Sequence, residues 1–306
     1  MDHHVNTLDL TAFKETVTQQ NLAVRGIRVF QNNLLTASWQ PVTLARQNIY
    51  SGTKSFTSAA CGFAVQEGLF SLDDRVLDHF PAEAPENPSS QLQNMRLIHL
   101  ITMSMGFDSP MLMGAQRPLM KEKDWVKYVL NAKTVHEPGT VFQYNNAGPY
   151  LLGILIQRKT GGSLVDYLMP RLFEPLGIEQ PLDEKDPLGS TFGAGGLMLN
   201  VDEFAKLGLL FLNEGCWNGR QLLPSEWIRT ASSPYIISNE GDDEIGRHYG
   251  YLLWMMPDGA YRCDGKYGQY CVVYPQKRAV IAVHSMQIEN EKAVLRSIVR
   301  DIMPLL

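Results

Sequence analysis

Cysteine is scarce in this chain, and its spacing excludes the common metal and redox sites. The four cysteines are Cys61, Cys216, Cys263 and Cys271, and no two of them form a C-x-x-C pair. The histidines do not have zinc-site spacing either. The pattern predicts mostly buried, reduced thiols, no metal and no cofactor. A disulfide between Cys263 and Cys271, which could flank a hairpin, stays open at this stage.

The chain also lacks an excess of basic charge and long apolar runs. It carries 27 basic and 32 acidic residues, a formal net charge of −5, without a basic stripe. This excludes nucleic acid as an expected partner. No apolar run reaches the roughly 18 to 20 residues that span a bilayer. Residues 1–4 have no features of a secretory signal, so we expect a cytoplasmic protein. With nucleic acid excluded, the expected partner is a small molecule.

What is present is the composition and patterning of a globular α+β protein. Hydrophobic residues make up 44% of the 306 and charged residues 19%. Strand-like segments gather near the two ends, at 25–30, 34–39, 249–256, 261–265, 269–274 and 279–286. Helical spacing dominates between them, and further helices are expected at 8–21 and 289–303. We predict a single domain over 1–306, with an antiparallel-sheet lobe from about 1–50 and 236–306 and a helical lobe from about 51–235.

The first candidate site motif is Ser51-Gly52-Thr53-Lys54, the only S-x-x-K in the chain. Positions i and i+3 share one face of a helix, so the hydroxyl and the amine can touch. A serine hydroxyl needs a base to become a nucleophile, and a buried lysine can be that base. The same spacing also fits a helix-capping serine and a solvated lysine.

The second motif is Tyr144-Asn145-Asn146. A phenol beside a lysine can be held as phenolate, or can pass a proton to a leaving group. Asn146 can steady the lysine or hold a substrate carbonyl. The alternative is a simple turn in which Asn146 caps a helix at 147–160 and Tyr144 packs in the core.

Together these residues resemble the serine β-lactamase and penicillin-binding-protein superfamily, above all the class C β-lactamase-related esterases and D-amino-acid peptidases. The matching segments, in order, are 51–56, 67–74, 97–106, 138–146, 195–205 and 217–223. The resemblance implies a β-lactamase/transpeptidase-like fold. It also implies that Ser51 is acylated, Lys54 moves its proton, Tyr144 assists as base or acid, and Asn146 binds the lysine or the substrate.

The chain departs from this family at its third motif, which is usually a cation, a variable residue and glycine. The best-fitting segment is Cys263-Asp264-Gly265, with Lys266-Tyr267-Gly268 as the alternative. In the first alignment, Gly265 lets substrate lie close to the backbone. The N–H groups of Lys266 and Ser51 would then form an oxyanion hole. The missing cation argues against β-lactams and favours a smaller or neutral ester, amide or peptide-like substrate.

Two other functions are weighed against a metal-independent serine hydrolase. A non-catalytic penicillin-binding-like sensor on the same scaffold would explain the altered third motif. A Ser-His-Asp hydrolase would need a G-x-S-x-G elbow, which the sequence lacks. The aromatic residues Tyr249, Tyr251 and Trp254 are expected to pack within the sheet rather than to form a ligand site.

Overall fold

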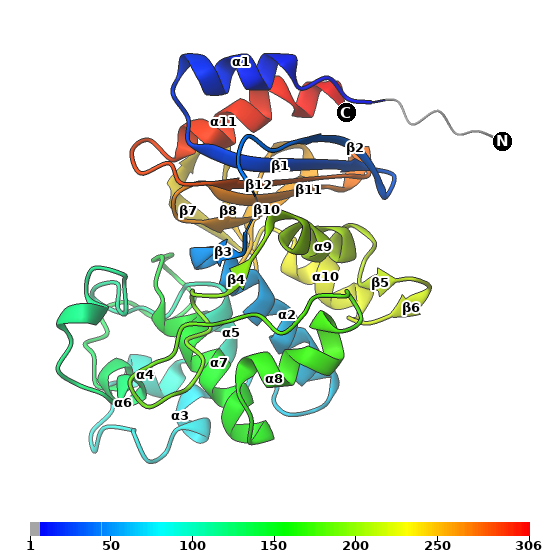
Figure 1. Cartoon of the computed structure of the whole chain (residues 1–306). Helices are drawn as coiled ribbons and strands as arrows, with labels where there is room; N and C mark the ends of the chain where they lie inside the picture. The colour runs from blue at the N-terminus through cyan, green and yellow to red at the C-terminus, as the bar shows by residue number, and fades with distance from the viewer. Residues whose placement is uncertain (1–6, 44) are drawn as a thin grey trace.

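An eight-stranded antiparallel sheet forms one lobe of the protein (Figure 1). The computed structural model describes residues 7–43 and 45–306, so the predicted absence of a signal at residues 1–4 lies outside it. The strand order is β2-β1-β12-β11-β10-β9-β8-β7, which places the two ends of the chain side by side. The bounds are β1 Val24–Gln31, β2 Leu34–Trp39, β7 Ile236–Asp242, β8 Gly246–Tyr249, β9 Trp254–Met255, β10 Tyr261–Gly265, β11 Gln269–Tyr274 and β12 Ala279–Ser285.

Two terminal helices, α1 (Thr11–Gln19) and α11 (Lys292–Asp301), cover one face of this sheet (Figure 1). The i, i+4 spacing of Val294 and Ile298 places both side chains in the core beneath α11, where both are fully buried. Phe13 of α1 is buried in the same apolar cluster. These contacts join the N-terminal and C-terminal segments into one layer.

The helical lobe lies against the opposite face. Helix α9 (Val201–Leu212) packs on β11 and β12, and α2 packs on α7 at the centre of the lobe. The other bounds are α2 Thr53–Gln66, α3 Val76–His79, α4 Ser90–Asn94, α5 Leu97–Ile101, α6 Trp125–Leu130, α7 Ala147–Thr160, α8 Leu164–Leu168 and α10 Ser225–Ala231. Two short strand pairs complete the structure: β3 (Gln47–Asn48) with β4 (Met198–Leu199), and β5 (Cys216–Trp217) with β6 (Arg220–Gln221).

The predicted α+β class, with its sheet of antiparallel strands and its helical lobe, is confirmed. The prediction of one strand over 249–256 is wrong, because the chain leaves the sheet between β8 and β9. A Cβ on Gly250 would lie 2.2 Å from the Ala231 carbonyl oxygen, and Leu252 has a φ of +59°. The edge strand β7 and the five-residue helix α8 were not predicted, because the first is half-exposed and the second is too short for clear periodicity.

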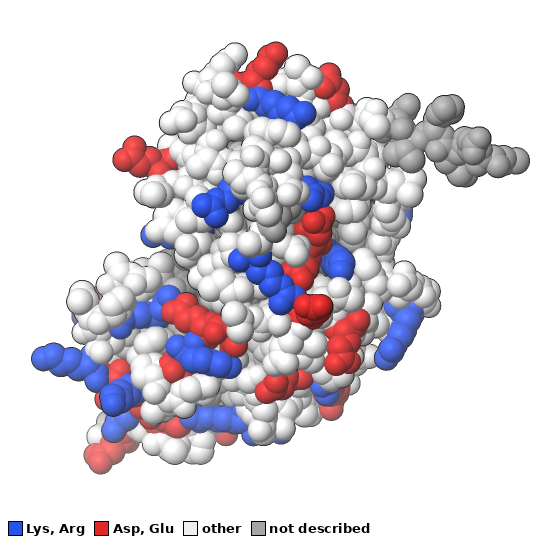
Figure 2. Space-filling view, in the orientation of Figure 1, with Lys and Arg blue, Asp and Glu red and all other residues white. Residues whose placement is uncertain are grey.

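On the face shown in Figure 2, acidic and basic side chains are interspersed. Within the described part of the chain, no helix has the length and apolarity that crossing a bilayer requires. The four cysteines are free thiols, although Cys263 and Cys271 are buried directly opposite each other on β10 and β11.

Candidate active site

The candidate nucleophile Ser51 lies in a short 3-10 turn, Tyr50–Gly52, that leads into α2. Tyr50 has a φ of +48°, a conformation that is strained for a residue with a side chain. The Asn48 side chain stabilises this turn by accepting a hydrogen bond from the Tyr50 N–H at 2.6 Å. Ser51 is half-buried, so its hydroxyl is held by the turn and is not sealed in the core.

Lys54 is held against Ser51, as the i, i+3 spacing predicts. Its side chain is only 2% exposed, and Nζ donates hydrogen bonds to Ser51 Oγ at 2.9 Å and to the Ala194 carbonyl at 2.7 Å. Burial lowers the pKa of Lys54 to about 7; the Arg117 charge adds to this effect and Asp264 opposes it. A large fraction of the amine is therefore neutral near pH 7 and can accept the serine proton.

Tyr144 lies on the other side of the lysine. The Lys54 amine is 5.0 Å from the centre of the Tyr144 ring. Trp254 stacks on this ring at 5.8 Å, and Tyr249 meets it edge-on at 6.5 Å. Burial raises the pKa of Tyr144 and hydrogen bonding with Ser51 opposes the rise. The raised pKa favours a neutral phenol that donates a proton over the phenolate considered from sequence.

The two asparagines after Tyr144 have different partners. Asn145 Oδ1 accepts from the N–H groups of Met111, at 3.1 Å, and Ala147, at 2.9 Å, and so caps α7. Asn146 Nδ2 donates to the Leu112 carbonyl at 2.9 Å, while its buried Oδ1 has no partner among the described residues. Asn146 occupies the N-cap position of α7, but its side chain makes no capping bond. The structure therefore leaves an acceptor free two residues beyond Tyr144.

The end of β10 forms the wall beside the nucleophile. A Cβ on Gly265 would lie 2.1 Å from the Ile49 carbonyl oxygen and 3.2 Å from the Gly52 nitrogen. The backbone of β10 therefore runs directly against the turn that carries Ser51, which no residue other than glycine would permit. Strand β10 ends at Gly265, as expected if Cys263-Asp264-Gly265 is the third family motif.

Asp264, one residue before this contact, brings a carboxylate to the wall. Its side chain is 26% exposed, and Oδ2 accepts a hydrogen bond from Arg262 Nε at 3.0 Å. Burial raises the pKa of Asp264, whereas Arg262, Lys292 and Lys54 act to lower it. The wall thus carries an acidic group paired with a buried arginine.

Lys266 is exposed, and its amine lies 4.8 Å from the centre of the Tyr267 ring. Tyr267 in turn meets Tyr50 edge-on, with ring centres 5.0 Å apart. In the described part of the chain, the backbone N–H of Lys266 has no hydrogen-bond partner. Its part in an oxyanion hole stays a prediction, and its side chain points to a surface position.

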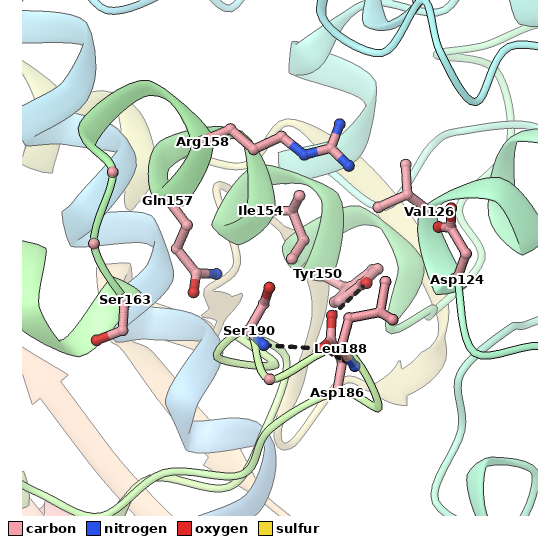
Figure 3. A pocket seen from close by; sticks show the side chains of 13 residues that line it. Asp124, Val126, Tyr150, Ile154, Gln157, Arg158, Ser163, Asp186, Leu188 and Ser190 are labelled. Atoms are coloured by element: carbon pink, nitrogen blue, oxygen red, sulfur yellow. Dashed lines mark hydrogen bonds between the residues drawn. The ribbon is translucent and has the colours of Figure 1, made fainter.

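Sequence reasoning missed several residues that build this site. The Ala194 carbonyl gives no sequence signal, because any residue can supply it. Trp254 and Tyr249 were assigned to sheet packing, yet they also enclose Tyr144. The hollow of about 370 Å³ shown in Figure 3 lies within the helical lobe, and none of the predicted site residues lines it.

Comparison with known proteins identifies the family of this chain. Residues 36–298 match the sequence model of the Beta-lactamase family. The chain belongs to the β-lactamase family. The match runs from β2 to α11, so it includes every residue of the candidate site.

Individual relatives are distant. An uncharacterized protein of Alkalihalophilus pseudofirmus is 26% identical over 264 residues, covering 76% of this chain and 71% of that protein. Protein flp of Staphylococcus aureus is 28% identical over 136 residues, which is 44% of this chain but only 27% of that protein. A putative 6-aminohexanoate-dimer hydrolase from Bacillus anthracis has a similar fold, with a TM-score of 0.77 and 22% identity over 94% of this chain and 79% of that one.

Proposed function

We propose that this protein is a serine hydrolase that cleaves an ester or amide bond through an acyl-enzyme on Ser51. The observation that carries the proposal is the 2.9 Å hydrogen bond between the Lys54 amine and Ser51 Oγ, made by a buried lysine. An amine with a pKa of about 7 can take the serine proton at neutral pH, which a solvated lysine cannot do.

The sequence of steps follows from the arrangement of the three groups. Lys54 accepts the hydroxyl proton as Ser51 Oγ attacks the substrate carbonyl. Tyr144, kept neutral by burial, donates its proton to the departing alcohol or amine and then takes up, from the Lys54 ammonium, the proton that Ser51 released. Water then attacks the acyl-enzyme while Lys54 accepts its proton, and Lys54 returns that proton to Ser51 Oγ as the acyl group leaves as the acid.

The wall formed by β10 supports a substrate without a carboxylate next to the scissile bond. Asp264 places negative charge beside the contact between Gly265 and the nucleophile turn. A substrate carboxylate there would meet a carboxylate that already holds the Arg262 guanidinium, and not a free cation. We therefore propose small neutral esters, amides or peptide-like compounds as substrates, with weak or absent β-lactamase activity.

A fluorophosphonate probe tests the nucleophile directly. Intact mass should increase by one adduct, peptide mapping should place it on Ser51, and Ser51→Ala should remain unlabelled. A panel of p-nitrophenyl esters, D-aminoacyl amides and a chromogenic cephalosporin should show turnover of esters or amides well above that of the cephalosporin. Labelling that persists in Ser51→Ala would remove the assignment.

A non-catalytic sensor on the same scaffold is the alternative, and the altered third motif is what favours it. It predicts that an ester acylates Ser51 but that the adduct stays. Intact mass followed over time after mixing with p-nitrophenyl acetate separates the two functions. Loss of the acetyl adduct within minutes supports the hydrolase, and an adduct stable for hours supports the sensor.

A further inference from the structure

Arg117, in the 3-10 turn Arg117–Leu119, has an environment that is unusual for a loop arginine. Only 18% of its side chain is exposed. Nη1 donates to the Leu112 carbonyl at 3.0 Å, and Nη2 donates to both carboxylate oxygens of Glu184, at 2.9 and 3.2 Å. The guanidinium also lies over the Phe192 ring, 4.3 Å from its centre. A guanidinium held on three sides in this way has a fixed position.

Through the Leu112 carbonyl, Arg117 reaches Asn146. The same oxygen accepts Asn146 Nδ2 at 2.9 Å and Arg117 Nη1 at 3.0 Å. Leu112 has a φ of +57°, a conformation that a leucine adopts only when its surroundings hold it there. The two donors supply that restraint. Without Arg117, the carbonyl that orients Asn146 would lose one of its two hydrogen bonds.

On its other side, Arg117 reaches the segment that binds the lysine. Phe192, beneath the guanidinium, is two residues before Ala194, whose carbonyl accepts the Lys54 amine at 2.7 Å. The backbone of Glu184 also accepts the Phe192 N–H at 2.9 Å. The arginine therefore joins the segment that holds Asn146 to the segment that holds Lys54.

We propose that Arg117 is a positioning residue, which fixes the Asn146 amide and the Ala194 carbonyl and so sets the surroundings of the Lys54 amine. The inference rests on the proposed function of Ser51. Arg117 acts through other groups and does not itself touch the nucleophile in the described structure. Arg117 holds the Leu112 carbonyl that also binds Asn146, and its positive charge acts on the Lys54 amine.

The charges that face Lys54 come from two sides. Arg117 disfavours the protonated amine from the helical lobe, and Asp264 favours it from β10; both act in addition to burial, which has the largest effect on the pKa of Lys54. Tyr144 faces the amine with a ring that burial keeps neutral. Removing Arg117 should therefore raise the pKa of the base, and removing the Asp264 charge should lower it. A general loosening of the fold would not shift the pKa of Lys54 in opposite directions in the two variants.

The experiment measures kcat/KM for p-nitrophenyl acetate, together with the rate of fluorophosphonate labelling, from pH 5 to 10. For Arg117→Met we expect the acid limb, where activity rises as Lys54 loses its proton, to move at least 0.5 pH unit upward. Arg117→Lys keeps the charge but not the planar fork, so the limb should stay within 0.2 unit while the rate falls several-fold. Asp264→Asn should move the limb downward.

Arg171 provides a matched control. It pairs with Glu67 at 2.6 Å, donates to the Tyr167 carbonyl and lies 4.0 Å from the centre of the Tyr167 ring. Glu67 follows Lys54 by 13 residues (67 − 54) along α2, which is about 20 Å. Arg171→Met removes the same kinds of contact far from the site, so it should leave the acid limb and the rate unchanged.

Each outcome decides something. An acid limb that stays in place in Arg117→Met, whatever the rate, overturns the electrostatic role, and so does a limb that moves in Arg171→Met. If Arg117→Met does not fold, Arg117→Lys and Asp264→Asn decide, and a limb that moves the wrong way in Asp264→Asn overturns the proposal. Wild-type protein that is never labelled on Ser51 would instead mean that the proposed function has failed.

Discussion

Two tyrosines in the same region, the half-buried Tyr144 and the buried Tyr150, each lie beside a charged group, but their surroundings differ in how completely the polar atoms are paired. Tyr150, on α7, donates a hydrogen bond to Asp186 Oδ2 at 2.8 Å (Figure 3). Asp186 Oδ1 accepts the N–H groups of Leu188 and Ser190, both at 2.9 Å. The phenol and both carboxylate oxygens of this cluster have partners, so the cluster closes a loop onto α7.

Tyr144, six residues earlier, lies among groups that are incompletely paired. Its partner is a lysine whose charge is disfavoured by burial, and the nearby Asn146 Oδ1 has no partner in the described structure. Fully paired polar groups stabilise a fold, whereas groups left strained or unpaired in a core mark positions kept for chemistry. The comparison therefore indicates a structural role for Tyr150 and supports the proposed role of Tyr144 in the reaction.

Removing the charged partner of each phenol should have the largest effect. Lys54→Met should lower kcat/KM for a p-nitrophenyl ester about 10³-fold, because the serine proton loses its acceptor. Asp186→Ala should instead lower the free energy of unfolding by about 3 kcal/mol, because two N–H groups and a phenol lose their acceptor. Steady-state kinetics and urea unfolding of both variants check this. The comparison breaks if Asp186→Ala loses activity while its stability is unchanged.

Removing the hydroxyl of either tyrosine should give smaller effects. Again, one variant should lose activity and the other should lose stability. Tyr144→Phe should lower kcat about 10²-fold through the lost proton donor and change stability by less than about 0.5 kcal/mol. Tyr150→Phe should lower stability by about 1 to 2 kcal/mol, because Asp186 loses a buried donor, and change kcat less than threefold. Equal losses of activity in the two variants would show that Tyr144 is not a proton donor.

The pH dependence of stability should identify the buried lysine. Its folded pKa of about 7 lies below its usual value of 10.5, so the unfolded chain binds more protons between these values. Stability therefore rises with pH across this window. Between pH 7 and 9 the wild type should gain about 2 kcal/mol more than Lys54→Met, in which this term is absent. Parallel urea titrations at both pH values measure the difference, and equal gains would mean that Lys54 is not buried as a neutral amine.

The smallest effect is expected for Lys266, the cation in the alternative alignment of the third motif. Lys266 is exposed and its amine lies over Tyr267, so Lys266→Ala should change kcat/KM for a neutral ester less than threefold. Only its backbone N–H, which the substitution retains, is proposed to face substrate. A tenfold rise in KM for an anionic ester alone would assign the lysine side chain a role in binding.

Most of the regular structure and the contact between Ser51 and Lys54 could be predicted from the sequence, for reasons that are local. Helix α7 and strands β10 and β11 have the predicted bounds, because their periodicity and flanking turns are clear. The pairing of Ser51 with Lys54 follows from helix geometry. The strand break at Gly250 could not be predicted, because it depends on the distant Ala231 carbonyl. The same holds for Arg117, since its contacts join segments that only tertiary packing brings together.

Gly265 has a consequence for how this protein could acquire a new substrate. Because a Cβ there would collide with the Ile49 carbonyl at 2.1 Å, two main chains set the spacing between strand and nucleophile. The contact is made by backbone atoms, so a side chain at position 265 would disrupt it directly. Directed evolution of specificity should therefore leave position 265 untouched and alter its neighbours, with Asp264 as the first position at which the charge of the wall can be reversed.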